Sequence, residues 1–243
     1  MTAGAPPRFY FSLRSPYSWL AHWDLTQRYP QVAASLEWRP FWEPDGESVR
    51  MLAEAGAGFP YVDHSRAKAR YVLADVRRLA ARRGLTVTWP VDRQPCWEVP
   101  HLAYLLAERY GRGRAFVAAV YRARWEEGAD ICDRATVARL ADELGLPAGE
   151  LAGAVDDPAA RRLGLEALLA VDADGVFGVP FFIHRYDKYW GVDRLPWFVE
   201  TLQAAPGGIE SGHEDRRPHE VSVEKGPVPA LPAGDQGHAG GCG

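Results

Sequence analysis

The spacing of apolar residues at the start of the chain predicts a strand, a helix and a second strand. The aromatic run RFYFSL at 8–13 is typical of a short strand. After it, apolar residues recur at the spacing of one helix face: Pro16, Trp19, Leu20 and Trp23. The stretch SLEWRPFW at 35–42 then alternates apolar and polar residues and predicts a strand that ends near Pro40. The opening order is therefore β-α-β.

Amphipathic helices are predicted through the middle of the chain, in the stretches 65–83, 98–110, 114–127 and 158–172. The clearest helix lies at 133–145, because Asp133 can cap its start, Gly145 can end it, and apolar residues line one face: Val137, Leu140, Ala141 and Leu144. The run GVPFFIHRYDKYWG at 178–191 predicts a tight β-hairpin. A last helix should follow, capped by Asp193, with this buried face: Leu195, Phe198, Val199 and Leu202.

This order predicts an α/β fold in which one sheet is split around a helical insertion. We expect a discontinuous domain made of residues 1–45 and 174–205, with an all-helical insertion domain at 46–173. Residues 206–243 hold nine Gly, five Pro and no aromatic residue. Such a segment cannot bury enough apolar area to offset the entropy of ordering, so we expect a disordered tail.

Composition and charge exclude some classes of partner. The net charge is −4, and residues 206–243 hold six acidic and three basic residues, which leaves the body near −1. A nearly neutral body gives no electrostatic reason to expect binding of nucleic acid or of an anionic membrane. No apolar run approaches the roughly 20 residues that span a bilayer. The start MTAGAPPRFYF lacks the basic and apolar regions of a signal peptide, so we expect a cytoplasmic protein.

The cysteines and histidines do not predict a metal or dithiol site. Cys96, Cys132 and Cys242 stand far apart, with no Cys-x-x-Cys and no metal-ligand spacing. Free cysteines usually behave as small apolar residues, and we expect that here. Four histidines also lack metal-ligand spacing and are expected in core or surface positions: His22, His64, His101 and His184.

The segment Ser15-Pro16-Tyr17-Ser18, at the predicted strand-to-helix junction, has two interpretations. Ser is a favoured N-cap and Pro a favoured first helical residue, so the segment could simply start a helix. A helix start also presents unpaired N–H groups and partial positive charge to an anion. A Ser hydroxyl at that position can donate to such an anion, and an incoming thiolate would suit it. Taken alone, the segment leaves both interpretations open.

Three later stretches also have a structural and a functional interpretation. Pro180 precedes a strand and faces a helix start, so the Val179–Pro180 bond is a candidate cis bond that would let the Val179 backbone pair with an extended ligand. Asp193 is either an N-cap or a carboxylate that binds an ammonium group. The stretch 122–133 is either a solvated helix end or a cleft wall that holds Trp125, Glu127 and Asp130.

Together these stretches resemble one protein family. FYFSLRSPYSWLA, WEEGADI and GVFGVPFFIHRYDKYWGVDRL are similar to sequences of the 2-hydroxychromene-2-carboxylate isomerases and kappa-class glutathione transferases, in the DsbA-like branch of the thioredoxin superfamily. The match covers roughly residues 8–203, in the expected order. The resemblance implies a thioredoxin-like fold at 1–45 and 174–205, interrupted by the helical domain at 46–173, with a cleft between the two.

The resemblance also implies a glutathione site. Ser15 matches the catalytic Ser of the family, whose hydroxyl contacts the glutathione sulfur. Val179, before the presumed cis Pro180, matches the residue whose backbone pairs with the cysteinyl part. Val192 and Asp193 match the pair that binds the γ-glutamyl end. No metal is implied, and because family members are often dimers, the resemblance allows a homodimer.

The chain departs from the family pattern on the side of the second substrate. Ser12 stands where the family has an acidic residue, Phe181 where it has a small hydroxyl residue, and Arg14 where it has a small or apolar one. The segment QPCWEVP at 94–100 lacks the family's Asn. We therefore expect a bulkier aromatic or polyketide-like substrate of secondary metabolism. Its pocket would be formed by these residues: Ser12, Arg14, Tyr17, Ser18, Trp125, Phe181 and Trp190.

The combined prediction is a thiol-dependent isomerase that acts by reversible thiolate addition to an unsaturated small molecule. Ser15 cannot ionise usefully near neutral pH, but its proton can form a charge-assisted hydrogen bond to a thiolate. The thiol would be glutathione or another bacterial thiol, since an Ala-, Arg- and Gly-rich composition suggests a high-GC bacterium. The alternatives are a kappa-like glutathione transferase and a non-catalytic binding or accessory protein of a biosynthetic pathway.

Overall fold

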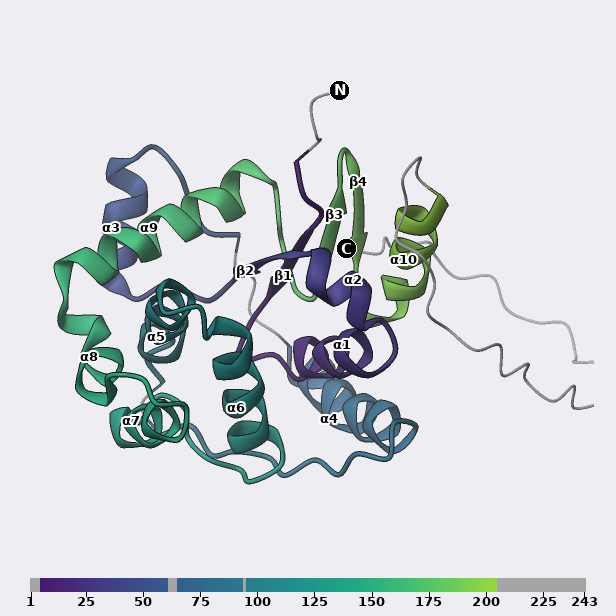
Figure 1. Ribbon diagram of the computed structural model, residues 1–243, viewed down its shortest axis with the longest axis horizontal. Helices are drawn as coiled ribbons and strands as arrows, with labels where there is room; N and C mark the ends of the chain where they lie inside the picture. The colour runs from purple at the N-terminus through teal and green to yellow at the C-terminus, as the bar shows by residue number, and fades with distance from the viewer. Residues whose placement is uncertain (1–4, 61–64, 94, 205–243) are drawn as a thin grey trace, which may run out of the picture. The chain divides into compact units, whose positions relative to one another are not determined.

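The computed structural model describes residues 5–60, 65–93 and 95–204, which belong to one compact unit, Met1–Ser211 (Figure 1). Its strands are β1 (Arg8–Phe11), β2 (Glu37–Pro40), β3 (Phe181–His184) and β4 (Asp187–Trp190). Its helices are α1 (Pro16–Gln27), α2 (Pro30–Ser35), α3 (Gly46–Glu54), α4 (Arg66–Ala81), α5 (Glu98–Arg109), α6 (Gly113–Trp125), α7 (Arg134–Glu143), α8 (Ala148–Ala152), α9 (Pro158–Ala173) and α10 (Leu195–Ala204), with 3-10 turns η1 (Ala154–Asp156) and η2 (Val192–Arg194). None of the helices in these ranges has the length and apolar character needed to cross a bilayer.

The four strands form one mixed sheet in the order β2-β1-β3-β4. Strands β1 and β2 run parallel, as a β-α-β unit requires, whereas β3 is antiparallel to both β1 and β4. Tyr10 lies opposite Phe181, which lies opposite Trp190. The β-α-β and β-β-α order predicted from the sequence is therefore confirmed, and helices α3 to α9 lie between the two parts in the chain.

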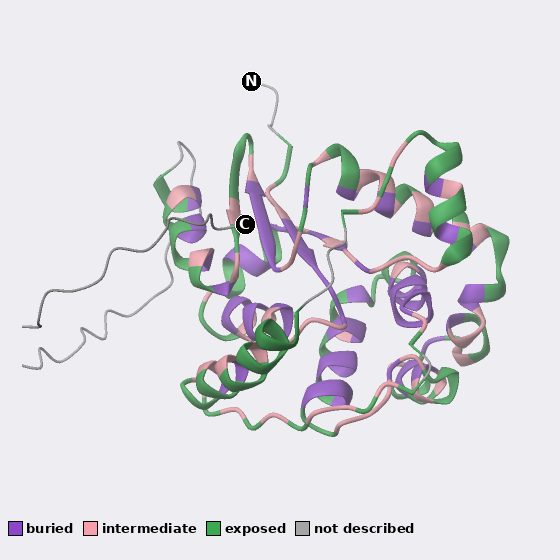
Figure 2. Cartoon of the chain, turned by 180° about the vertical axis from the view of Figure 1, so that it is seen from behind, coloured by how far each residue is buried: buried purple, intermediate pink, exposed green. Residues whose placement is uncertain are grey.

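Both faces of the central strands are buried, which explains why β1 and β3 read as nearly continuous apolar runs (Figure 2). On one face Phe9 stacks on Phe182 at a ring-centroid distance of 5.0 Å, and Phe182 stacks on Phe198 of α10 at 5.1 Å. The other face belongs to a second cluster, to which α9 contributes: Tyr10, Val171, Val176, Phe181 and Ile183.

The helical part of the molecule is organised around α5, which is buried along most of its length (Figure 2). Helix α4 is far more exposed, with only Val76 and Ala80 buried. Two polar contacts tie α4 and the residues that follow it to α1. Tyr17 donates to Asp75 at 2.9 Å, and Arg83 donates twice to Asp24, at 2.5 and 3.1 Å.

Most of the predicted helices and strands are confirmed, and the structure also contains short helices that were not predicted. Asp133 caps α7 by accepting from the N–H of Ala135 at 3.0 Å, and Gly145 follows that helix with a φ of +67°. Helices α2, α3 and α8 were not predicted from the apolar spacing. The Asp193 carboxylate bonds to Arg194 instead of capping α10, which begins after η2. The predicted division into two domains stays a prediction, and the predicted disorder at 206–243 lies outside the described residues.

Candidate active site

Sheet register brings the three predicted thiol-binding segments to one edge of the sheet. Because β1 and β3 are antiparallel, with Tyr10 opposite Phe181, the chain leaving β1 toward Ser15 emerges where the chain enters β3 from Pro180. Strand β4 ends at the same edge and leads into η2, which contacts α1. The N–H of Gly191 donates to the C=O of Pro180 at 2.9 Å, which joins two of these segments directly.

Ser15 caps α1 and keeps its own proton free. Its Oγ accepts from the N–H of Ser18 at 3.2 Å, and its N–H donates to the C=O of Ser12 at 3.0 Å. Since the oxygen is the acceptor of the capping bond, the hydroxyl proton can point toward an anion in front of the helix. The side chain is partly exposed, and Pro16 occupies the first helical position. The capping interpretation of this segment is therefore confirmed, and the anion-binding interpretation stays a prediction that the partly exposed position of Ser15 allows.

Ser18 has a different role from Ser15. It is fully buried, and its Oγ accepts from the N–H of Ser12 at 3.2 Å. The two hydroxyls of the Ser-x-x-Ser spacing are thus divided between a partly exposed position and an internal support for the loop between β1 and α1.

The bond between Val179 and Pro180 is cis, as the sequence suggested. Val179 is partly buried, and outside helices and strands no described backbone group bonds to its N–H or C=O. A ligand with an extended backbone could therefore pair with both groups.

The chain from β4 to η2 presents one exposed carboxylate. Val192 is buried, whereas the side chain of Asp193 is 68% exposed and accepts from Arg194 at 2.6 Å. Gly191 adopts a φ of +102°, and a Cβ there would lie 2.6 Å from the Asp193 carboxylate. Glycine at 191 thus leaves room for the carboxylate.

Arg14 brings positive charge to the turn that carries Ser15. Its guanidinium lies 5.0 Å from the centre of the Trp97 ring and donates to Glu43 at 2.7 Å, yet the side chain stays 41% exposed. Arg124 also lies over Trp97, at 5.2 Å, and is bound through both terminal nitrogens to Asp92. Arg14 is therefore the more accessible of the two cations on this aromatic ring.

Tyr17 faces α4. Burial and the bond to Asp75 raise the pKa of its phenol, so the hydroxyl stays protonated and donates.

Several residues expected in a substrate pocket are buried in the protein core. Trp125 stacks on Trp19 at 6.2 Å and meets the edge of Trp89 at 5.7 Å. Phe181 belongs to the second core cluster. Burial separates four of the expected residues from solvent: Ser12, Ser18, Trp125 and Phe181. Trp190, in contrast, is 52% exposed and packs on the exposed Phe177 at 5.1 Å.

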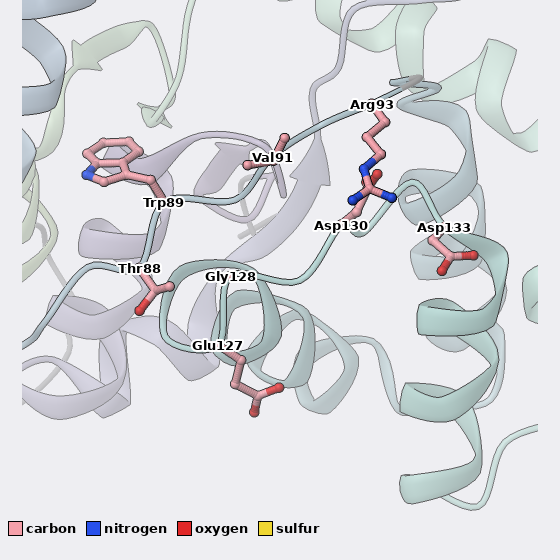
Figure 3. Close-up of a pocket in the computed structure, with 8 residues that line it drawn as sticks. All are labelled: Thr88, Trp89, Val91, Arg93, Glu127, Gly128, Asp130 and Asp133. Atoms are coloured by element: carbon pink, nitrogen blue, oxygen red, sulfur yellow. The ribbon is translucent and has the colours of Figure 1, made fainter.

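A cavity of about 450 Å³ lies between the segment before α5 and the turn from α6 to α7 (Figure 3). Its lining includes Glu127 and Asp130 but not Trp125, so the stretch 122–133 does face a hollow through its acidic residues. The full lining is Thr88, Trp89, Val91, Arg93, Glu127, Gly128, Asp130 and Asp133.

Three potential metal ligands meet at the start of α5, although the sequence shows no metal spacing. Asp45, Cys96 and Glu98 place one ligand atom each within 4.8 Å of one another. Their oxygens already have protein partners, because Asp45 accepts from Arg161 at 2.8 Å and Glu98 accepts from the N–H of Asp45 at 2.6 Å. These bonds account for the cluster as an internal polar network.

His101 lies in the core, one of the two positions expected from the sequence, but its contact with the loop that carries Ser15 was not predicted. It lies in the apolar run VPHLAYLL of α5, and it is completely buried. A polar side chain on a buried helix face must find hydrogen-bond partners, and this requirement was the available signal. Its closest partners are the N–H of Leu13 and the C=O of Trp97, and the Ser12 hydroxyl lies farther from Nε2, at 3.5 Å.

Comparison with known proteins identifies the family of the chain. The sequence model of the DSBA-like thioredoxin domain matches residues 8–203. The chain belongs to the DsbA-like thioredoxin family. This DsbA-like protein is 30% identical over 194 residues to the 2-hydroxychromene-2-carboxylate isomerase of Sphingobium xenophagum, which covers 80% of this chain and 96% of that enzyme. The fold and the family expected from the sequence are confirmed.

Solved structures show the same DsbA-like fold. A 2-hydroxychromene-2-carboxylate isomerase (HCCA isomerase) aligns with a TM-score of 0.62 and 24% identity, over 81% of this chain and 93% of that one. The cytosolic disulfide reductase DsbM of Pseudomonas aeruginosa, in its structure with GSH, aligns with a TM-score of 0.53 and 18% identity, over 80% and 97%. The 30% identity to an isomerase supports isomerase activity for this chain.

Proposed function

We propose that this protein is a thiol-dependent isomerase that uses glutathione, or another small thiol, to isomerise an unsaturated anionic aromatic molecule. The observation that carries the proposal is the meeting of Ser15, Val179 and Asp193 at one edge of the sheet. A hydroxyl at a helix start, an unpaired backbone segment and an exposed carboxylate match the sulfur, the peptide backbone and the ammonium group of glutathione. The structure of DsbM with GSH supports this choice of thiol.

The start of α1 favours the thiolate form of a bound thiol. Ser15 can donate a charge-assisted hydrogen bond to the sulfur while its oxygen accepts from the helix. Helix α1 has 12 residues, and its partial positive charge acts in the same direction. Each unit by which the thiol pKa falls corresponds to about 1.4 kcal/mol. The protein itself has no thiol at 15 or 18, so the sulfur must come from the ligand.

The thiolate then acts as a nucleophile that is regenerated. Its sulfur adds to the β-carbon of a double bond conjugated with a carbonyl. The π electrons of that bond shift toward the carbonyl, and the negative charge moves onto the carbonyl oxygen of an enolate. The former double bond is now single and rotates. Return of the electron pair rebuilds the double bond and expels the thiolate, so substrate and product have the same mass and no thiol is consumed.

Arg14 indicates the charge of the substrate. It is the partly exposed cation on the turn that carries Ser15, and its guanidinium lies over Trp97. A guanidinium in that position suits a carboxylate or a phenolate. The substrate in the names of the isomerase relatives is a carboxylate. The exposed rings of Phe177 and Trp190 support an aromatic or polyketide-like body for the substrate of this protein.

The test compares turnover with and without glutathione, using 2-hydroxychromene-2-carboxylate and related unsaturated aromatic carboxylates as probes. Mass spectrometry separates the outcomes, because an isomerase gives a product of unchanged mass and a transferase gives a stable thioether. Full activity without any thiol would refute the thiol role. Tight binding of the probes with no turnover would instead support a non-catalytic binding protein.

Substitution of Ser15 tests the hydroxyl. We expect Ser15→Ala to lower turnover by about 10²-fold, by analogy with the loss of one oxyanion-hole donor. The same change removes a helix cap, which costs about 1 kcal/mol of stability. Ser65→Ala is the matched control, because Ser65 caps α4 through the same bond, to the N–H of Lys68 at 3.2 Å. Equal turnover in the two variants would show that the Ser15 hydroxyl has no chemical role.

A further inference from the structure

His101 connects the helical part of the molecule to the loop that carries Ser15. Its Nε2 lies 3.1 Å from the backbone nitrogen of Leu13, and its Nδ1 lies 2.6 Å from the carbonyl oxygen of Trp97. A carbonyl can only accept, so Nδ1 carries the proton and Nε2 is the bare acceptor of the Leu13 N–H. The two contacts together determine a single tautomer.

This tautomer is maintained over the physiological pH range. Burial, with smaller contributions from the charges of Arg124 and Arg14, lowers the pKa of His101 to about 3, against an opposing effect of the Trp97 carbonyl. The imidazole also stacks on the Trp42 ring, with centroids 5.2 Å apart and planes 16° apart. The ring therefore stays neutral, and a flip of the ring would break both of its hydrogen bonds, to Leu13 and to Trp97.

The loop from β1 to α1 transmits the position of Leu13 to Ser15. Ser12 lies at the centre of this loop: its C=O accepts from the N–H of Ser15 at 3.0 Å and from the hydroxyl of Tyr121 at 3.0 Å. Its Oγ accepts from the N–H of Arg14 at 3.3 Å. The N–H groups of Leu13, Arg14 and Ser15 are thus each hydrogen-bonded, to His101, to Ser12 Oγ and to the Ser12 carbonyl. These bonds orient Ser15.

We propose that His101 is a positioning residue for the thiol site, which holds the Leu13 N–H so that the Ser15 hydroxyl faces the bound sulfur. The proposal rests on the thiol-dependent function argued above. It assigns a role in catalysis to a side chain that lies 88 positions from Leu13 in sequence, on a helix of the predicted insertion. A small displacement of a catalytic group lowers rates by as much as about 10²-fold, so the accuracy of this contact is sufficient to matter.

Two substitutions separate the contact to Leu13 from the stability of the core. The amide oxygen of Gln reaches about as far as Nε2 of histidine, so His101→Gln keeps an acceptor for the Leu13 N–H. Asn reaches only about as far as Nδ1, so His101→Asn can keep the bond to Trp97 but loses the one to Leu13. Both variants lose the stacking on Trp42, so this loss is common to them and does not distinguish their effects.

The experiment measures two properties in the wild type and in both variants. Hydrogen exchange at the Leu13 amide reports the contact itself, and titration of the thiolate absorbance of bound glutathione reports the effect on sulfur. We expect His101→Asn to speed exchange at Leu13 about 10-fold or more, and to return the thiol pKa toward that of free glutathione. We expect His101→Gln to resemble the wild type in both.

Each of the other outcomes contradicts one part of the proposal: the positioning role, the loop contact or the thiol-dependent function. If both variants unfold more easily but keep the wild-type thiol pKa, His101 is a core residue only and the positioning role is wrong. If His101→Asn leaves exchange at Leu13 unchanged, the contact does not hold the loop. If wild-type protein binds no glutathione, the proposed function fails, and Leu13 exchange alone then decides whether His101 orders the loop.

Discussion

Acidification should destabilise this protein through a histidine that is buried in its neutral form. The pKa of His101 falls from 6.5 to about 3 on folding, chiefly because burial penalises the charged ring. Between these two values the unfolded chain binds a proton that the folded chain does not. Stability is therefore fully present above pH 6.5 and is lost as the pH falls toward 3.

The size of the effect follows from the width of that window. Each pH unit within it costs about 1.4 kcal/mol per histidine, so acidification from pH 6.5 to 5 costs about 2 kcal/mol through His101. His22, packed against the rings of Trp38 and Tyr121, has a pKa lowered to about 4 and adds a contribution in the same direction, smaller because the side chain is partly exposed. Burial raises the pKa of Glu98, which acts in the opposite direction.

Urea denaturation at pH 7 and at pH 5 measures the effect, with the variant compared against the wild type so that the contribution of Glu98 cancels. The His101→Gln variant should lose about 2 kcal/mol less than the wild type between the two pH values. His184→Gln is the control, because His184 ends β3 and is partly exposed, without the complete burial of His101. An equal pH dependence in wild type and His101→Gln would refute the argument that His101 is neutral when folded.

Two further predictions concern stability and are checked by the same denaturation assay. Asp24→Asn should cost about 3 kcal/mol or more, because it leaves the nearly buried guanidinium of Arg83 without its charge partner, whereas Glu54→Gln in an exposed pair should cost less than about 1 kcal/mol. Gly164→Ala should cost about 1–3 kcal/mol, because its Cβ would lie 2.5 Å from a leucine methyl carbon of α5, whereas Gly149→Ala, with nothing within 4 Å, should stabilise α8. Equal effects within either pair would contradict the packing described.

Local patterns were sufficient to predict the framework of the fold. Apolar runs and alternation indicated the strands, and the helical spacing of apolar residues indicated the long helices. Both signals arise because these elements bury one face or, in β1 and β3, both faces. Helices α2, α3 and α8 escaped prediction because they have only 6, 9 and 5 residues, and so short a segment gives an apolar spacing little room to repeat. The segment from Ser15 and the pair Val179–Pro180 were identified because their residue types have distinct backbone requirements.

The sequence could not predict the contacts that join distant segments. Tyr17 meets Asp75 and Leu13 meets His101, and no local pattern relates members of such pairs. The same limit applies to Trp125, an aromatic residue near a predicted helix end that turns out to stack inside the core. The sequence also could not show that Ser15 is partly exposed and Ser18 buried. A separation of three residues at a helix start does not indicate how far each side chain is buried.

The burial of Ser18 determines how easily evolution or engineering can move this scaffold toward disulfide exchange. Exchange of Ser15 for cysteine places a thiol at a partly exposed helix start, where a thiolate is favoured. Exchange of Ser18 for cysteine instead replaces the oxygen that accepts from the N–H of Ser12 with a larger, weakly accepting sulfur in a closed site. The two substitutions are therefore unequal steps. A cysteine at 15 weakens one partly exposed capping bond, whereas a cysteine at 18 disturbs the buried bond that supports the loop before a redox pair can form.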